Sequence, residues 1–140
     1  MGGSADNVRI CKCARGCKDT LVEYKCPWVH RNIDPKEAFF TKEIGGVKVD
    51  NVEQLRPDCR YFYQVQLTLF VTELDTCDFV VWISKGIHCV KDDADKCFMG
   101  NVLLKLEKFW LAQVVPAMFD DNDTMKEKGQ YDVENFPANY

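Results

Sequence analysis

The sequence predicts one mixed α/β (α+β) domain. Its 140 residues, 46% of them hydrophobic, match the common size of a single globular domain and can bury an ordinary core. Short apolar and β-branched runs indicate strands, and a later three- and four-residue spacing of apolar side chains indicates a long amphipathic helix. We expect the domain to occupy residues 1–119 and the acidic residues 120–140 to form a flexible tail.

The first predicted element is a β-hairpin. Residues 7–13 and 19–26 are typical of two short strands joined by a turn at residues 14–18. That turn would set residue 9 opposite residue 23 in an antiparallel pair. Asp6 would then lie at the open end of the hairpin, next to Lys25 and Cys26, and a modest bend or bulge would bring it toward Glu23.

The middle of the chain begins with a helix signal. Asp34 as N-cap and Pro35 at the first helical position predict a short helix. Residues 41–59 contain a Gly-Gly pair and a proline, which indicates either a long excursion or an extra hairpin. Residues 60–72 alternate apolar and polar side chains, so periodicity alone predicts a strand there.

The last predicted elements complete the sheet and add a helix. Residues 78–84 are apolar on both faces, which favours a buried central strand with residues 86–90 as its partner. The amphipathic helix is expected over residues 95–119, ending or kinking before Pro116. Three large aromatic residues are expected in the core: Trp82, Phe109 and Trp110.

Bulk properties exclude several classes of protein. No apolar run is long enough to span a membrane and the N-terminus lacks the apolar stretch of a secretory signal, so we expect no membrane partner and an intracellular location, nuclear or cytoplasmic. The formal net charge of −4 argues against a strong nonspecific grip on polyphosphate. Eight cysteines without a secretion signal favour free thiols or metal ligation over disulfides.

The pattern that points most directly to chemistry is Glu23-x-Lys25. On an extended strand these side chains project from the same face, about 6–7 Å apart, which suits a site that binds a metal ion beside a water molecule. The same spacing recurs at Asp34 and Lys36, where a helix start explains it. Mg²⁺ is usually held by one or two carboxylates with waters and phosphates, so Asp6 is the candidate second ligand. An exposed, salt-bridged strand face is the competing interpretation.

The cysteines permit a second kind of metal site. Cys11, Cys13 and Cys17 would supply three thiolates near one turn, and Cys26 a fourth, although the spacing fits no standard zinc finger. A zinc-stabilised interaction domain is therefore a weaker alternative. The other four are expected to be small core residues: Cys59, Cys77, Cys89 and Cys97.

Four motifs follow one another along the chain: GGSADN (2–7), LVEYKCPWVHR (21–31), YFYQVQ (61–66) and CDFVVWISKG (77–86). In this order they closely resemble the YqaJ-type viral recombinase domain, the lambda-exonuclease-like branch of the PD-(D/E)XK nuclease superfamily. With the helix expected at residues 95–119, the resemblance covers most of the chain. It implies a restriction-endonuclease-like mixed sheet flanked by helices.

The resemblance also implies a divalent-metal nuclease site. Asp6 and Glu23 would ligate Mg²⁺ or Mn²⁺, with the backbone carbonyl of Tyr24 as a further ligand. Lys25 would orient the attacking water or stabilise charge on the phosphate. Gln64 would position the site or the nucleotide.

Two further expectations depend on the same resemblance. It implies a helix at residues 60–72, where Gln64 and Gln66 point about 200° apart and only one can reach the metal site. We expect that one to be Gln64. His30 and Arg31 are candidate contacts to DNA phosphates.

The activity implied is that of an exonuclease acting on duplex DNA ends in viral or mobile-element recombination, with DNA as partner and a homo-oligomer, a trimer in the family. The family's S-P-D-G reads Ser4-Ala5-Asp6-Asn7 here, and only five residues precede Asp6. We therefore expect an N-terminally truncated domain that lacks the family's first helical part, which puts catalysis by this chain in question. The alternative is a catalytically inactive remnant that acts as a DNA-binding or assembly module.

Overall fold

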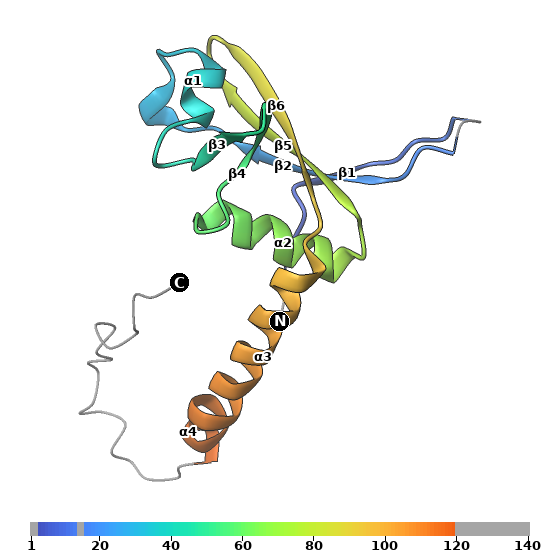
Figure 1. Cartoon of the computed structure of the whole chain (residues 1–140), viewed down its shortest axis with the longest axis vertical. Coiled ribbons are helices and arrows are strands. Elements are labelled where there is room, and N and C mark those ends of the chain that lie inside the picture. Colours follow the sequence, from blue (N-terminus) through green and yellow to red (C-terminus); the bar gives the residue numbers. More distant parts are fainter. Residues whose placement is uncertain (1–2, 14–15, 120–140) are drawn as a thin grey trace. The chain divides into compact units, whose positions relative to one another are not determined.

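The computed structural model describes residues 3–13 and 16–119 (Figure 1). The chain is a mixed α+β protein with a mixed sheet, as predicted. The chain divides into two compact units, Met1–Met99 and Gly100–Tyr140. The tail expected at residues 120–140 lies outside the described residues. In the described ranges, no helix is long and apolar enough to cross a membrane.

A four-stranded sheet in the order β1-β2-β5-β6 forms the frame of the first unit. Its strands are β1 (Asn7–Arg9), β2 (Thr20–Lys25), β5 (Thr76–Ile83) and β6 (Gly86–Asp93). β1 with β2 and β5 with β6 pair antiparallel, whereas β2 and β5 pair parallel. The central strand and its hairpin partner were therefore predicted correctly.

The register of the first hairpin differs from the prediction. Asn7 lies opposite Val22, and Arg9 opposite Thr20 rather than opposite Glu23. Pairing ends at Arg9, so the connection spans residues 10–19 and is longer than the five-residue turn that the glycine suggested. Continuing this register sets Asp6 opposite Glu23 instead of beside Cys26.

Parallel strands need a long crossover, and the chain between β2 and β5 supplies it. It contains a 3-10 helical turn (Trp28–His30), α1 (Pro35–Phe39), β3 (Gly46–Val49), β4 (Val52–Leu55) and α2 (Arg60–Thr72). β3 and β4 form the extra hairpin. α1 starts as predicted, because the Asp34 side chain accepts a hydrogen bond from the Lys36 backbone N–H at 2.8 Å.

Residues 60–72 are a helix, as the family resemblance implies, and the strand predicted from periodicity is wrong. The Cys59 side chain caps its first turn by accepting from the Phe62 backbone N–H, and Glu73 ends it at a φ of 57°. Its buried side chains recur at three- and four-residue spacing: Phe62, Val65, Gln66, Thr68 and Leu69. This buried face, rather than the alternation, determines the conformation.

The core lies on one face of the sheet. Leu21 and Phe79 from the strands are buried together with Phe39 of α1 and with Val65 and Leu69 of α2. Because strand side chains alternate between faces, Trp82 falls on the opposite face to its neighbour Val81 and is 53% exposed. The prediction that Trp82 is a core residue was wrong.

The described part of the second unit is helical. α3 (Lys96–Phe109) begins in the first unit and is followed by a π-helical turn (Trp110–Val114) and α4 (Val115–Phe119). The π-helical turn stands where the sequence predicted an end or a kink before Pro116. Phe109 and Trp110 are 47% and 52% exposed, so their predicted core positions were also wrong.

Candidate active site around Glu23

The centre of the candidate site is a buried carboxylate. Glu23 on β2 is 1% exposed, and its Oε1 accepts hydrogen bonds from Nζ of Lys25 and from Nε2 of Gln64. The other oxygen, Oε2, is buried without a hydrogen-bond partner in the part of the chain that the structure describes. A buried carboxylate oxygen with no donor is costly, so this atom is a candidate ligand for a cation. The salt-bridged but exposed strand face considered above does not apply.

Lys25 is held beside the carboxylate by the sheet and by α2. Its side chain is only 15% exposed, and its Nζ lies 4.9 Å from the centroid of the Tyr61 ring. An ammonium over an aromatic face is stabilised electrostatically. Tyr61 therefore helps to hold the Lys25 charge at Glu23, a contact that no sequence pattern had indicated.

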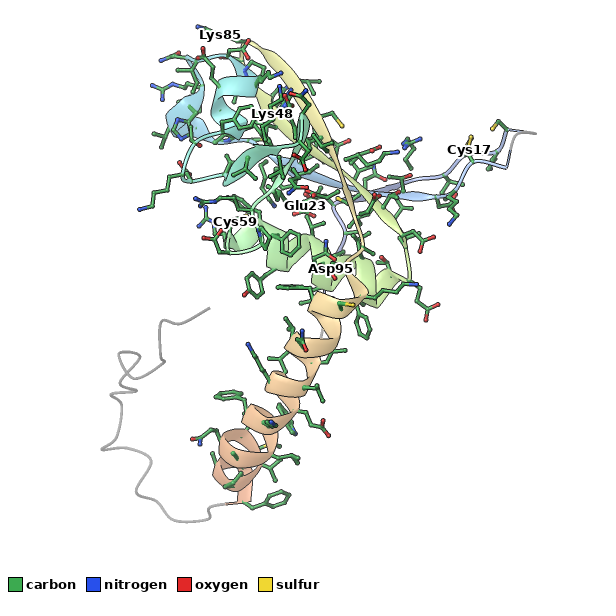
Figure 2. The ribbon with its side chains drawn as sticks, viewed as in Figure 1. Cys17, Glu23, Lys48, Cys59, Lys85 and Asp95 are labelled. Atoms are coloured by element: carbon green, nitrogen blue, oxygen red, sulfur yellow. The ribbon has the colours of Figure 1, made fainter. Side chains whose placement is uncertain are left out.

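The two glutamines of α2 have separate partners. Gln66 is buried; its Nε2 donates to the Asp93 carbonyl at 2.9 Å, and its Oε1 accepts from the Asp95 backbone N–H at 2.6 Å. The Gln64 side chain has a different partner, because its Nε2 donates to Oε1 of Glu23. Figure 2 shows Glu23 where β2 lies next to α2. Of the two glutamines, Gln64 is the one with a hydrogen bond to Glu23.

Asp6 is joined to the same strand. Its Oδ2 accepts a hydrogen bond from the Tyr24 backbone N–H at 2.9 Å, and its side chain is exposed. This hydrogen bond joins the Asp6 carboxylate to the residue that follows Glu23 on β2.

A second buried carboxylate lies further along this face of the sheet. Asp92 on β6 is opposite Cys77, and burial raises its pKa to about 6, although a hydrogen bond from the Leu55 backbone N–H opposes the shift. Burial, together with the charges of Asp92 and Glu23, raises the pKa of Cys77 to about 12. Cys77 therefore stays a neutral thiol. Sequence reasoning missed Asp92, because its only signal is its inward position on an alternating strand.

The predicted phosphate contacts have local partners. Nε2 of His30 lies 3.0 Å from Oε2 of Glu43. The Arg31 guanidinium lies 4.4 Å from the Trp28 ring centroid and donates to the Trp28 carbonyl at 3.0 Å. None of these contacts involves Glu23.

The cysteines divide into groups that the sequence did not separate. Cys59 and Cys77 are buried as predicted, whereas Cys89 and Cys97 are exposed and were wrongly predicted to be core residues. Cys26 was the expected fourth zinc ligand, but it follows the other end of β2 and is not part of the thiol cluster. That cluster comprises three residues: Cys11, Cys13 and Cys17.

Glu23, Lys25 and Gln64 bring together one carboxylate, one ammonium and one amide, and Asp6 adds a second carboxylate that is bonded to the neighbouring Tyr24 N–H. Two carboxylates suffice for a hydrated Mg²⁺ ion that completes its shell with waters and phosphate oxygens. The chain matches no protein-family model, no curated protein and no solved structure.

Proposed function

We propose that the chain is a metal-dependent deoxyribonuclease of the PD-(D/E)XK type that hydrolyses phosphodiester bonds at duplex DNA ends. The observation that carries this proposal is the buried Glu23, with one oxygen bonded to Lys25 and Gln64 and the other without a partner among the described residues. The ordered motifs that resemble YqaJ-type domains support the same activity. A purely structural ion pair would leave the unpaired Oε2 unexplained.

The residues present fit a hard divalent cation. Oε2 of Glu23 and the exposed carboxylate of Asp6 would ligate Mg²⁺ or Mn²⁺, and the Tyr24 carbonyl between Glu23 and Lys25 is the proposed further ligand. When bound, the ion lowers the pKa of a water molecule and neutralises charge on the phosphate.

Lys25 and Gln64 complete the proposed site. Lys25 places a positive charge next to the carboxylate, where it stabilises negative charge that develops on the phosphate. Gln64 donates to Glu23 and so fixes the orientation of the carboxylate. The Lys25 ammonium is itself fixed by the Tyr61 ring.

Degradation of linear duplex DNA by the purified chain tests the proposal. We expect degradation with Mg²⁺ or Mn²⁺, none after chelation, and no digestion of covalently closed circles. Glu23→Gln and Asp6→Asn should lose activity, because each removes a charged ligand. Asp34→Asn is the matched control, since Asn also caps a helix and this position lies outside the site.

Failure of the wild-type chain to cut DNA with either ion would reject the enzyme. Measured binding to the same DNA would then distinguish an inactive DNA-binding module from a protein with no affinity for DNA.

A further inference from the structure

Three thiols gather on the connection between β1 and β2. Sγ of Cys13 lies 3.1 Å from Sγ of Cys11 and 3.3 Å from Sγ of Cys17, and the three sulfurs all lie within 4.8 Å of one another. Figure 2 shows Cys17 on this connection, well away from the labelled Glu23. The cluster is therefore separate from the candidate active site.

Burial does not account for this cluster. Cys13 and Cys17 are exposed and Cys11 is half-buried, so these side chains are not filling a core. None of them forms a disulfide. Small apolar thiols gain nothing from convergence on a solvated turn, whereas thiolates converge where they share a metal ion.

The sulfur positions suit a tetrahedral thiolate site. Zn–S bonds of about 2.3 Å in a tetrahedron place the sulfurs about 3.8 Å apart. Two of the observed separations, 3.1 and 3.3 Å, are shorter than that value, and rotations of the side chains would bring the sulfurs to it. Soft thiolates select zinc or copper(I) over Mg²⁺ or Mn²⁺, which hard carboxylates prefer.

We propose that Cys11, Cys13 and Cys17 bind one zinc ion through three thiolates, with a water molecule in the fourth position. Three protons leave the thiols when the ion binds, and no electrons are transferred. This site is independent of the proposed nuclease activity and takes a different metal ion.

The site would add a cross-link to this connection. Strand pairing stops at Arg9 and Thr20; beyond them the Gly16 N–H donates to the Cys13 carbonyl at 3.4 Å, and Lys18 forms an ion pair with Asp75 at 2.6 Å. A zinc cross-link closes this loop in place of strand pairing.

Zinc binding should depend on pH. The thiols must lose their protons before they bind the ion, so affinity should rise with increasing pH.

Metal titration of the reduced full-length chain tests this proposal. We expect one zinc ion per chain by elemental analysis after dialysis, and sulfur-to-metal charge-transfer absorption when cobalt(II) is added instead. The variant with Cys11, Cys13 and Cys17 changed to Ser should lose both signals and keep the wild-type circular dichroism of the sheet, because these side chains lie outside the core.

The matched control changes the same number of exposed cysteines elsewhere, at Cys26, Cys89 and Cys97, to Ser. It should bind zinc as the wild type does. The proposal is overturned if the reduced wild-type chain binds no zinc, if the cluster variant retains it, or if the control variant loses it.

Discussion

At the scale of single residues, two buried carboxylates on one sheet face have different environments. Glu23 is compensated by Lys25 and Gln64, whereas Asp92 receives a backbone hydrogen bond from Leu55 and has an unpartnered Oδ2 within the described structure. Burial without a cation favours the neutral acid. Asp92 is therefore expected to affect stability, and Glu23 to affect function.

Asp92 predicts a specific pH dependence. Its pKa is raised to about 6 in the folded chain, against about 3.9 when unfolded, so the folded state binds more protons in this window. The stabilisation is complete below the unfolded pKa and is lost as the pH rises through the folded pKa. Asn does not ionise, so the Asp92→Asn variant does not lose this stabilisation as the pH rises. Its free energy of unfolding should therefore exceed that of the wild type by about 2–3 kcal/mol at pH 7, but not at pH 4.

Urea unfolding of both proteins at the two pH values measures this difference. Asp50→Asn is the control, since Asp50 is exposed at the turn between β3 and β4 and Asn tolerates its positive φ of 49°. A stability difference between Asp92→Asn and the wild type that stays constant with pH would show that Asp92 does not titrate abnormally.

The site residues were predictable only in part. Glu23 and Lys25 follow from strand alternation, and Asp6 and Gln64 from the resemblance of ordered motifs. Tyr61 and Asp92 were missed because their roles come from contacts with other elements, of Tyr61 with β2 and of Asp92 with β4 and β5. Such contacts leave no spacing pattern in the sequence.

At the scale of elements, α2 shows how periodicity misleads. Alternating polar and apolar residues predict a strand, yet the buried face of α2 has helical spacing and includes the polar Gln66. The predicted register of the first hairpin was wrong for a related reason. A glycine indicates a turn but does not fix the length of the loop around it. The observed register differs from the predicted one by three residues, so its continuation pairs Asp6 with Glu23 rather than with Cys26.

The two glutamines of α2 give a paired prediction. Gln66→Leu leaves the Asp93 carbonyl and the Asp95 N–H without their partner, and should cost about 1–3 kcal/mol of unfolding free energy. Gln64→Leu should cost less than Gln66→Leu but reduce DNA cleavage. Thermal unfolding and cleavage rates of both variants check this; equal effects on both quantities would contradict the separate roles.

At the scale of the whole molecule, the fold class was predictable because each strand and helix carries its own local signal. The exposure of large side chains was not, because it depends on which faces are covered. The chain has three tryptophans, and all are at least half exposed: Trp28 at 74%, Trp82 at 53% and Trp110 at 52%.

These exposures predict the intrinsic fluorescence of the native chain. Emission should be red-shifted and strongly quenched by iodide, and unfolding in urea should change it little, because water already contacts all three rings. A blue-shifted emission that resists iodide would mean that these rings are covered in solution.

The central claim is that Glu23 and Lys25 form a catalytic site, while the identical spacing at Asp34 and Lys36 does not. The most direct test compares the Mg²⁺-dependent cleavage rates of Lys25→Met and Lys36→Met on linear duplex DNA. The Lys36 side chain forms an ion pair with Glu53 outside this site, so its loss should leave the rate unchanged. Lys25→Met should slow cleavage by about 10²–10⁴-fold while the chain still folds. Equal rates for the two variants, or no cleavage by the wild type, would contradict the claim.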